Sequence, residues 1–130
     1  MHRRSVLTGF LLLIGPALAV AAEPEIFTGL VPGVGAGGYD AVSYFSGKPA
    51  KGDAKYSTTW KNATWQFSSA DNLKAFEAAP EKYAPQYGGY CAWAVSQGYH
   101  AKGDARFWSI ENGKLYLNYN AKVQTDWEKD

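Results

Sequence analysis

The sequence predicts a single small α+β domain in which a small antiparallel β-sheet carries two or three short helices. Three observations lead to this prediction. Short runs of aromatic and β-branched residues, bounded by turn residues, are typical of strands. An Asn-Gly pair at positions 112–113 joins two such runs and indicates a two-residue hairpin turn. A helical pattern that begins at a pair of serines and ends at Pro80 lies between the runs.

We expect the strands to form two hairpins after a short first strand. The second and third strands turn at Lys61-Asn62, and the last two turn at Asn112-Gly113. The expected strands are residues 41–45, 56–60, 64–67, 107–110 and 114–118.

The helices are shorter and less sharply defined than the strands. Ser68 or Ser69 can cap the main helix, because a serine hydroxyl accepts a hydrogen bond from a free N–H group of the first turn. Residues 81–83 predict one further turn, and residues 121–127 predict a closing helix. Residues 90–96 fit either a helix or a strand, and we favour a helix. The pattern predicts neither an internal repeat nor a second domain.

The first residues have the character of an export signal. Residues 1–22 combine Arg3 and Arg4, an uncharged run of about 13 residues and a small-residue cleavage pattern. The arginine pair resembles a twin-arginine signal, although the general export pathway stays open. The run is shorter than the roughly 20 residues of a spanning helix, so we expect cleavage, no membrane anchor and a periplasmic or secreted protein. Residues 23–38 then form a Gly/Pro-rich lead-in, extended or mobile, before the domain at 39–130.

The charge of the mature chain excludes some partner classes. Cleavage removes Arg3 and Arg4 and leaves 11 basic and 12 acidic residues, which are scattered along the chain. Binding to nucleic acid requires a concentrated positive face, and so does electrostatic binding to a membrane. We therefore expect neither nucleic acid nor a membrane surface as a partner.

Several motifs resemble the YHS domain family, and they cover most of the mature chain. Residues 67–77 and 79–83 resemble the family's strand and helix, while residues 87–92 and 113–118 resemble its exported single-domain branch. The resemblance implies an α+β fold. Other YHS domains accompany heavy-metal transporters and metal-dependent oxygenases, where the family carries a cysteine pair. This chain has Ser68 and Asn72 at those positions, so the pair is not carried over.

Cys91 and His100 are the only thiol and the only imidazole after the signal. Together they suit copper or zinc, because a thiolate and an imidazole bind such ions well. The alternatives are a buried inert cysteine, a reactive thiol or thiol-linked dimer of an otherwise monomeric protein, and a cysteine-dependent enzyme. In the enzyme, His100 would act as the base and Asp104 would orient it, an arrangement that we do not favour.

Aromatic residues gather around the cysteine and suggest a binding surface. Tyr87, Tyr90, Trp93 and Tyr99 surround Cys91 in the sequence, where they fill the core or form an exposed rim. We predict a non-enzymatic exported binding domain. The main hypothesis is that this domain holds a transition metal at Cys91 and His100. The alternative is that it is an interaction module for an exported protein or a small ligand.

Overall fold

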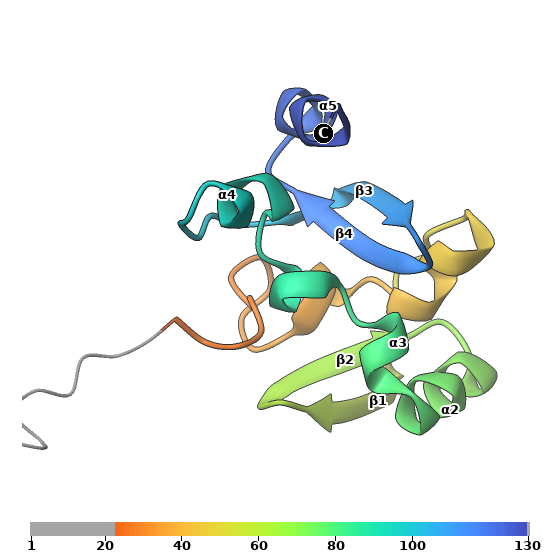
Figure 1. Ribbon diagram of the computed structural model, residues 1–130. Coiled ribbons are helices and arrows are strands. Elements are labelled where there is room, and N and C mark those ends of the chain that lie inside the picture. The colour runs from red at the N-terminus through yellow and green to blue at the C-terminus, as the bar shows by residue number, and fades with distance from the viewer. Residues whose placement is uncertain (1–22, 130) are drawn as a thin grey trace, which may run out of the picture.

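The computed structural model describes residues 23–129, so the expected signal peptide at 1–22 lies outside the described residues. The α+β class is confirmed. The strands form two separate antiparallel sheets of two strands each, and Figure 1 shows one hairpin above the other. No helix within residues 23–129 is both long enough and apolar enough to cross a membrane. The strands are β1 (Asp53–Trp60), β2 (Ala63–Phe67), β3 (Asp104–Glu111) and β4 (Lys114–Asn118).

Short helices connect and cover the two hairpins. Ser69 caps α2 as expected, with its hydroxyl 3.1 Å from the Asn72 backbone nitrogen. The segment at 90–96 contains a helix, as favoured from the sequence. The α-helices are α2 (Ala70–Ala78), α3 (Pro80–Tyr83), α4 (Ala92–Ser96) and α5 (Ala121–Glu128), and the 3₁₀ helices are η1 (Gly35–Gly38), η2 (Ala41–Ser46) and η3 (Gln86–Gly89).

The prediction of a strand at 41–45 is wrong, because these residues form the 3₁₀ helix η2. The cause is Asp40, the residue before the helix. Its Oδ1 accepts hydrogen bonds from the Val42 and Ser43 backbone nitrogens at 2.9 and 3.1 Å. These bonds satisfy the free N–H groups of the first turn and favour helix over strand.

The chain contains an internal repeat, which the sequence pattern did not predict. Elements of a first unit (residues 35–78) recur 51 positions later in a second unit (residues 86–128): β1 begins at Asp53 and β3 at Asp104. The segment Ala-Lys-Gly-Asp-Ala occurs at 50–54 and again at 101–105. The corresponding elements are η1 and η3, η2 and α4, β1 and β3, β2 and β4, and α2 and α5.

The backbone of the two units agrees residue by residue. Ala36 and its counterpart Tyr87 have φ of 52° and 59°, a left-handed conformation that is unusual for residues other than glycine. The bridge between Tyr39 and Lys51 recurs between Tyr90 and Lys102. The repeat escaped the sequence pattern because the identical residues are mostly turn residues, whereas the core side chains differ.

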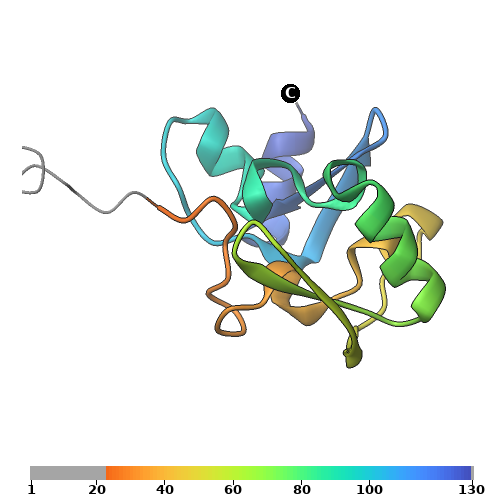
Figure 2. The same cartoon turned by 90° about the horizontal axis from the view of Figure 1, so that it is seen from below.

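The lead-in packs into the domain, which contradicts the expectation of a mobile or extended segment outside the core. Ile26 is buried in the core cluster that contains Trp65 and Phe67 of β2. The Phe27 nitrogen donates to the Gly88 carbonyl at 2.9 Å, and the Thr64 nitrogen donates to the Gly33 carbonyl at 2.9 Å. The lead-in, orange in Figures 1 and 2, therefore lies beside β2 and also holds η3. Gly88 permits this approach, because a Cβ there would lie 1.8 Å from the Glu25 carbonyl oxygen.

Asp40 is a fully buried carboxylate that joins three elements of the first unit. Besides the two η2 nitrogens, it accepts hydrogen bonds through Oδ2 from the Ser68 nitrogen, the Ser68 hydroxyl and the Asn72 amide at 2.7–2.8 Å. Ser68 and Asn72 are the positions at which the resemblance to the YHS family would place a cysteine pair. Here their side chains meet on a carboxylate and serve as hydrogen-bond donors.

We expect Asp40→Asn to lower the free energy of unfolding by about 3 kcal/mol, because an amide group would replace one of the two accepting oxygens and face other donors. Asp53→Asn is the matched control: Asp53 is exposed, its carboxylate accepts only from the Lys55 nitrogen, and we expect a change within about 0.5 kcal/mol. Urea denaturation of residues 23–130 measures both. Equal effects of the two substitutions would contradict this role of Asp40.

Candidate functional site

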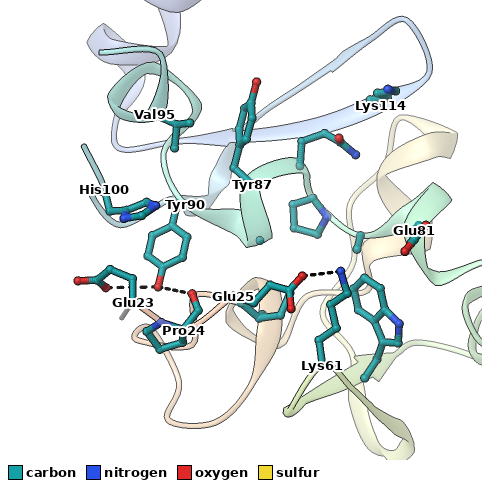
Figure 3. Close-up of a pocket in the computed structure, with 16 residues that line it drawn as sticks. Glu23, Pro24, Glu25, Lys61, Glu81, Tyr87, Tyr90, Val95, His100 and Lys114 are labelled. Atoms are coloured by element: carbon teal, nitrogen blue, oxygen red, sulfur yellow. Dashed lines mark hydrogen bonds and ion pairs between the residues drawn. The ribbon is translucent and has the colours of Figure 1, made fainter. Parts of the chain in front are cut away.

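A pocket of about 600 Å³ lies where the lead-in, the end of β1 and the second unit meet (Figure 3). Its walls combine aromatic rings with charges of both signs. This volume is within the range of pockets that hold small organic molecules. Its principal polar and aromatic residues are Glu23, Lys61, Tyr87, Tyr90, His100 and Lys114.

Tyr90 and His100 form one wall of this pocket. The imidazole packs on the Tyr90 ring with 4.6 Å between ring centres. The Tyr90 hydroxyl donates to the Pro24 carbonyl oxygen at 2.9 Å and lies 3.4 Å from Glu23 Oε1. Burial, together with the Glu23 carboxylate, raises the pKa of Tyr90. The phenol therefore stays protonated at neutral pH and fixes the lead-in against the second unit.

Lys61 and Glu25 fix the opposite wall. Lys61 Nζ lies 2.6 Å from Glu25 Oε2 and 4.7 Å from the centre of the Trp60 ring. The hydrogen bond to Glu25 raises the pKa of Lys61. Lys61 occupies the left-handed β1–β2 turn, which directs its side chain to the lead-in. The pocket is thus held together by contacts between segments far apart in the sequence.

Cys91 lies outside the pocket, in the interior of the second unit. Its side chain is only 1% exposed, and its Sγ is 3.4 Å from Asn118 Oδ1, which also accepts from the Trp93 nitrogen at 2.9 Å. Tyr90 lines the pocket, whereas the Cys91 sulfur lies against Asn118 and Cys91 is not a lining residue. His100 lines the pocket beside Tyr90, whereas the sulfur of Cys91 is buried in the protein interior.

The Cys91 sulfur thus has Asn118 as its partner and the His100 ring has Tyr90, and the joint metal site at Cys91 and His100 stays a prediction. Within residues 23–129, no three His, Cys, Asp or Glu side chains are grouped as metal ligands. The enzyme alternative is not supported either. The Asp104 carboxylate is bound by Arg106 at 2.8 and 3.0 Å, and this hydrogen bonding lowers the pKa of Asp104.

The four expected aromatic residues separate into two groups. Tyr87 and Tyr90 line the pocket; Tyr87 is 51% exposed, whereas Tyr90 is buried. Trp93 and Tyr99 instead pack edge to face, 6.5 Å apart, outside the pocket lining. Sequence reasoning missed Glu23, Lys61 and Lys114. The breaker-rich composition of the lead-in gave no sign that its glutamates line a pocket.

Comparison with known proteins gives no assignment. No protein-family model, no curated protein and no solved structure matches this chain.

We expect the Cys91 thiol to resist Ellman's reagent in the native protein and to react fully in denaturant. The physical reason is burial. The reagent reacts only with a thiolate that it can reach, and the interior position blocks its access to the sulfur. The measurement is the absorbance time course with and without urea. Rapid labelling of the native thiol would contradict the interior position.

We also expect Cys91→Ala to leave the affinity for Cu(I) and Zn(II) unchanged, because the sulfur is buried against Asn118. Metal titrations of the mature protein and of this variant measure the two affinities. A loss in the variant alone would restore Cys91 as a metal ligand. Circular dichroism of both proteins controls for misfolding.

Proposed function

We propose that the protein is an exported, non-enzymatic YHS-type binding domain that holds a small polar organic molecule in the pocket of Tyr90 and His100. The observation that carries this proposal is the construction of the pocket. Five stretches of the chain contribute aromatic and charged side chains to one concavity of about 600 Å³, namely residues 23–26, 60–61, 81–90, 95–100 and 114. Ligand sites combine apolar walls with a few well-placed polar groups in this way.

The polar groups suggest what the ligand presents. Glu23 and Glu81 are available for positive groups, and Lys114 for a negative one, while Lys61 is already paired with Glu25. The exposed imidazole of His100 offers a flat face and a hydrogen-bonding nitrogen. A zwitterion or a polar molecule with a flat ring satisfies these groups better than an aliphatic chain, which would leave the charges desolvated and unpaired.

The proposal separates the pocket from the cysteine. Cys91 supports the second unit from inside and takes no part in binding. The proposed binding region still includes Tyr87 and Tyr90, as expected from the sequence, but its centre lies closer to the lead-in than the sequence predicted. Copper or zinc bound jointly by Cys91 and His100 receives no support from the described geometry.

We expect His100→Ala to weaken ligand binding by about tenfold, or about 1.4 kcal/mol. The probes are a set of amino acids, amines and aromatic acids, titrated into isotope-labelled residues 23–130 and followed by NMR. Tyr99→Ala is the matched control, because Tyr99 is also exposed but lies outside the pocket lining. We expect no change in its affinity.

Two results would overturn this assignment. One is that no probe in the set gives saturable shifts at the pocket residues. The other is that a bound probe loses as much affinity with Tyr99→Ala as with His100→Ala, since the binding surface would then lie elsewhere.

A further inference from the structure

A second, smaller pocket lies between hairpin β3–β4 and α5, the helix on the outer side of the upper sheet in Figure 1. Its volume is about 210 Å³, and it is lined by Glu111, Tyr116, Trp127 and Glu128. None of these four residues lines the larger pocket. The two pockets are therefore separate candidate sites.

The internal repeat explains why this pocket is open. In the first unit, three rings fill the corresponding space: Trp60, Trp65 and Phe76, with centres 5.2–5.9 Å apart. In the second unit, Tyr116 and Trp127 keep the places of Trp65 and Phe76, and their ring centres are 4.8 Å apart. The third ring has no counterpart.

Glu111 replaces that third ring. It is the last residue of β3, as Trp60 is the last residue of β1, 51 positions earlier. A half-buried tryptophan that packs against the core of the first unit thus corresponds to an exposed carboxylate in the second unit. The substitution leaves two aromatic faces without their third partner and places a negative charge beside them.

The surroundings of the pocket increase its negative character. Glu128 Oε2 accepts a hydrogen bond from the Ser109 hydroxyl, which fixes the carboxylate at the pocket wall. No basic residue lines the pocket among residues 23–129. Lys114, opposite Glu111 in the hairpin, lines the larger pocket instead, and no ion pair between the two occurs in this part of the chain.

We propose that this small pocket binds the ammonium group of a small organic cation. The alkyl groups of the cation lie against Tyr116 and Trp127, and its charge faces Glu111 and Glu128. Aromatic faces attract cations through their quadrupole, and this attraction is strongest for tryptophan. The neighbouring Tyr87 ring, 6.0 Å from Tyr116, extends the aromatic surface.

Other ligand classes fit the pocket less well. An anion would meet two carboxylates, and a neutral ring would cover them without a compensating charge. A divalent metal would find two carboxylates, one of them already hydrogen-bonded, and two aromatic walls that supply no ligand atoms. The volume is below that of pockets for drug-sized molecules and suits a single head group.

Choline is the test probe, and its neutral isostere 3,3-dimethylbutan-1-ol is the matched ligand control. Titration of residues 23–130 is followed through the Trp127 indole N–H signal, assigned with Trp127→Phe. We expect choline to shift this signal saturably and to bind at least tenfold more tightly than the neutral alcohol. Equal affinity for the two compounds would overturn the proposal, and so would the absence of a saturable shift with choline.

The protein variants provide an independent test. We expect Glu111→Gln to weaken choline binding by about tenfold, whereas Glu77→Gln leaves it unchanged. Glu77 is the counterpart of Glu128 in the first unit, where the rings fill the space, and both substituted residues are exposed. Equal affinity of the two variants for choline would remove Glu111 from the site.

A third variant, Glu111→Trp, rebuilds the three-ring arrangement of the first unit. We expect it to abolish the choline-induced shift while the protein remains folded by circular dichroism. If it folds and still binds choline with unchanged affinity, the empty third ring position is not the binding site. If it does not fold, Glu111→Gln decides alone.

Discussion

Tyr44 joins the two units of this protein, and the rest of the architecture depends on that contact. A two-stranded hairpin is at best marginally stable alone, because it cannot bury enough apolar surface. Tyr44 belongs to the first unit but is buried in the core of the second, with Leu115 and Leu117. Its hydroxyl donates to the Ala105 carbonyl at 2.6 Å, and burial raises the pKa of this phenol. Each hairpin thus packs against a side chain from outside its own unit. Ile26 of the lead-in packs against the first hairpin, and Tyr44 packs against the second.

The same backbone is stabilised differently in the two units. At the position of Asp40 the second unit has Cys91, and at the positions of Ser68 and Asn72 it has Tyr119 and Val123. A carboxylate at 91 would lack these donors, and burying it unpaired would cost several kcal/mol. A thiol is a weak donor that tolerates burial. Asn118 then supplies the oxygen that caps α4, a role that Asp40 performs in the first unit.

Much of the local structure could be predicted from the sequence because it depends on short-range chemistry. The Asn112-Gly113 turn and the Ser69 cap are examples, since each depends on a few neighbouring residues. The helix at 41–46 escaped prediction because its residues resemble a strand, and because the Asp40 carboxylate that caps it is held in place by donors 28 and 32 positions away. The positions of Cys91 and His100 required knowing which side of an extended segment faces the interior. The larger pocket depends on Glu23 and Lys61, which no local pattern connects.

Each candidate pocket has a lining residue in the second unit that differs in size or charge from its counterpart in the first unit. Val95 lines the larger pocket, and its counterpart is Tyr44, whose ring fills the junction between the units. Glu111 lines the smaller pocket, and its counterpart is Trp60, whose ring packs against the core. In each case a large aromatic side chain in the first unit corresponds to a smaller or charged one in the second. A side chain that fills the core stabilises the fold, whereas the loss of a ring opens a cavity and lowers the stability of the fold. The first unit therefore supplies a filled aromatic core and, with Trp60 and Lys61, part of the larger pocket, whereas the smaller pocket is lined by the second unit alone.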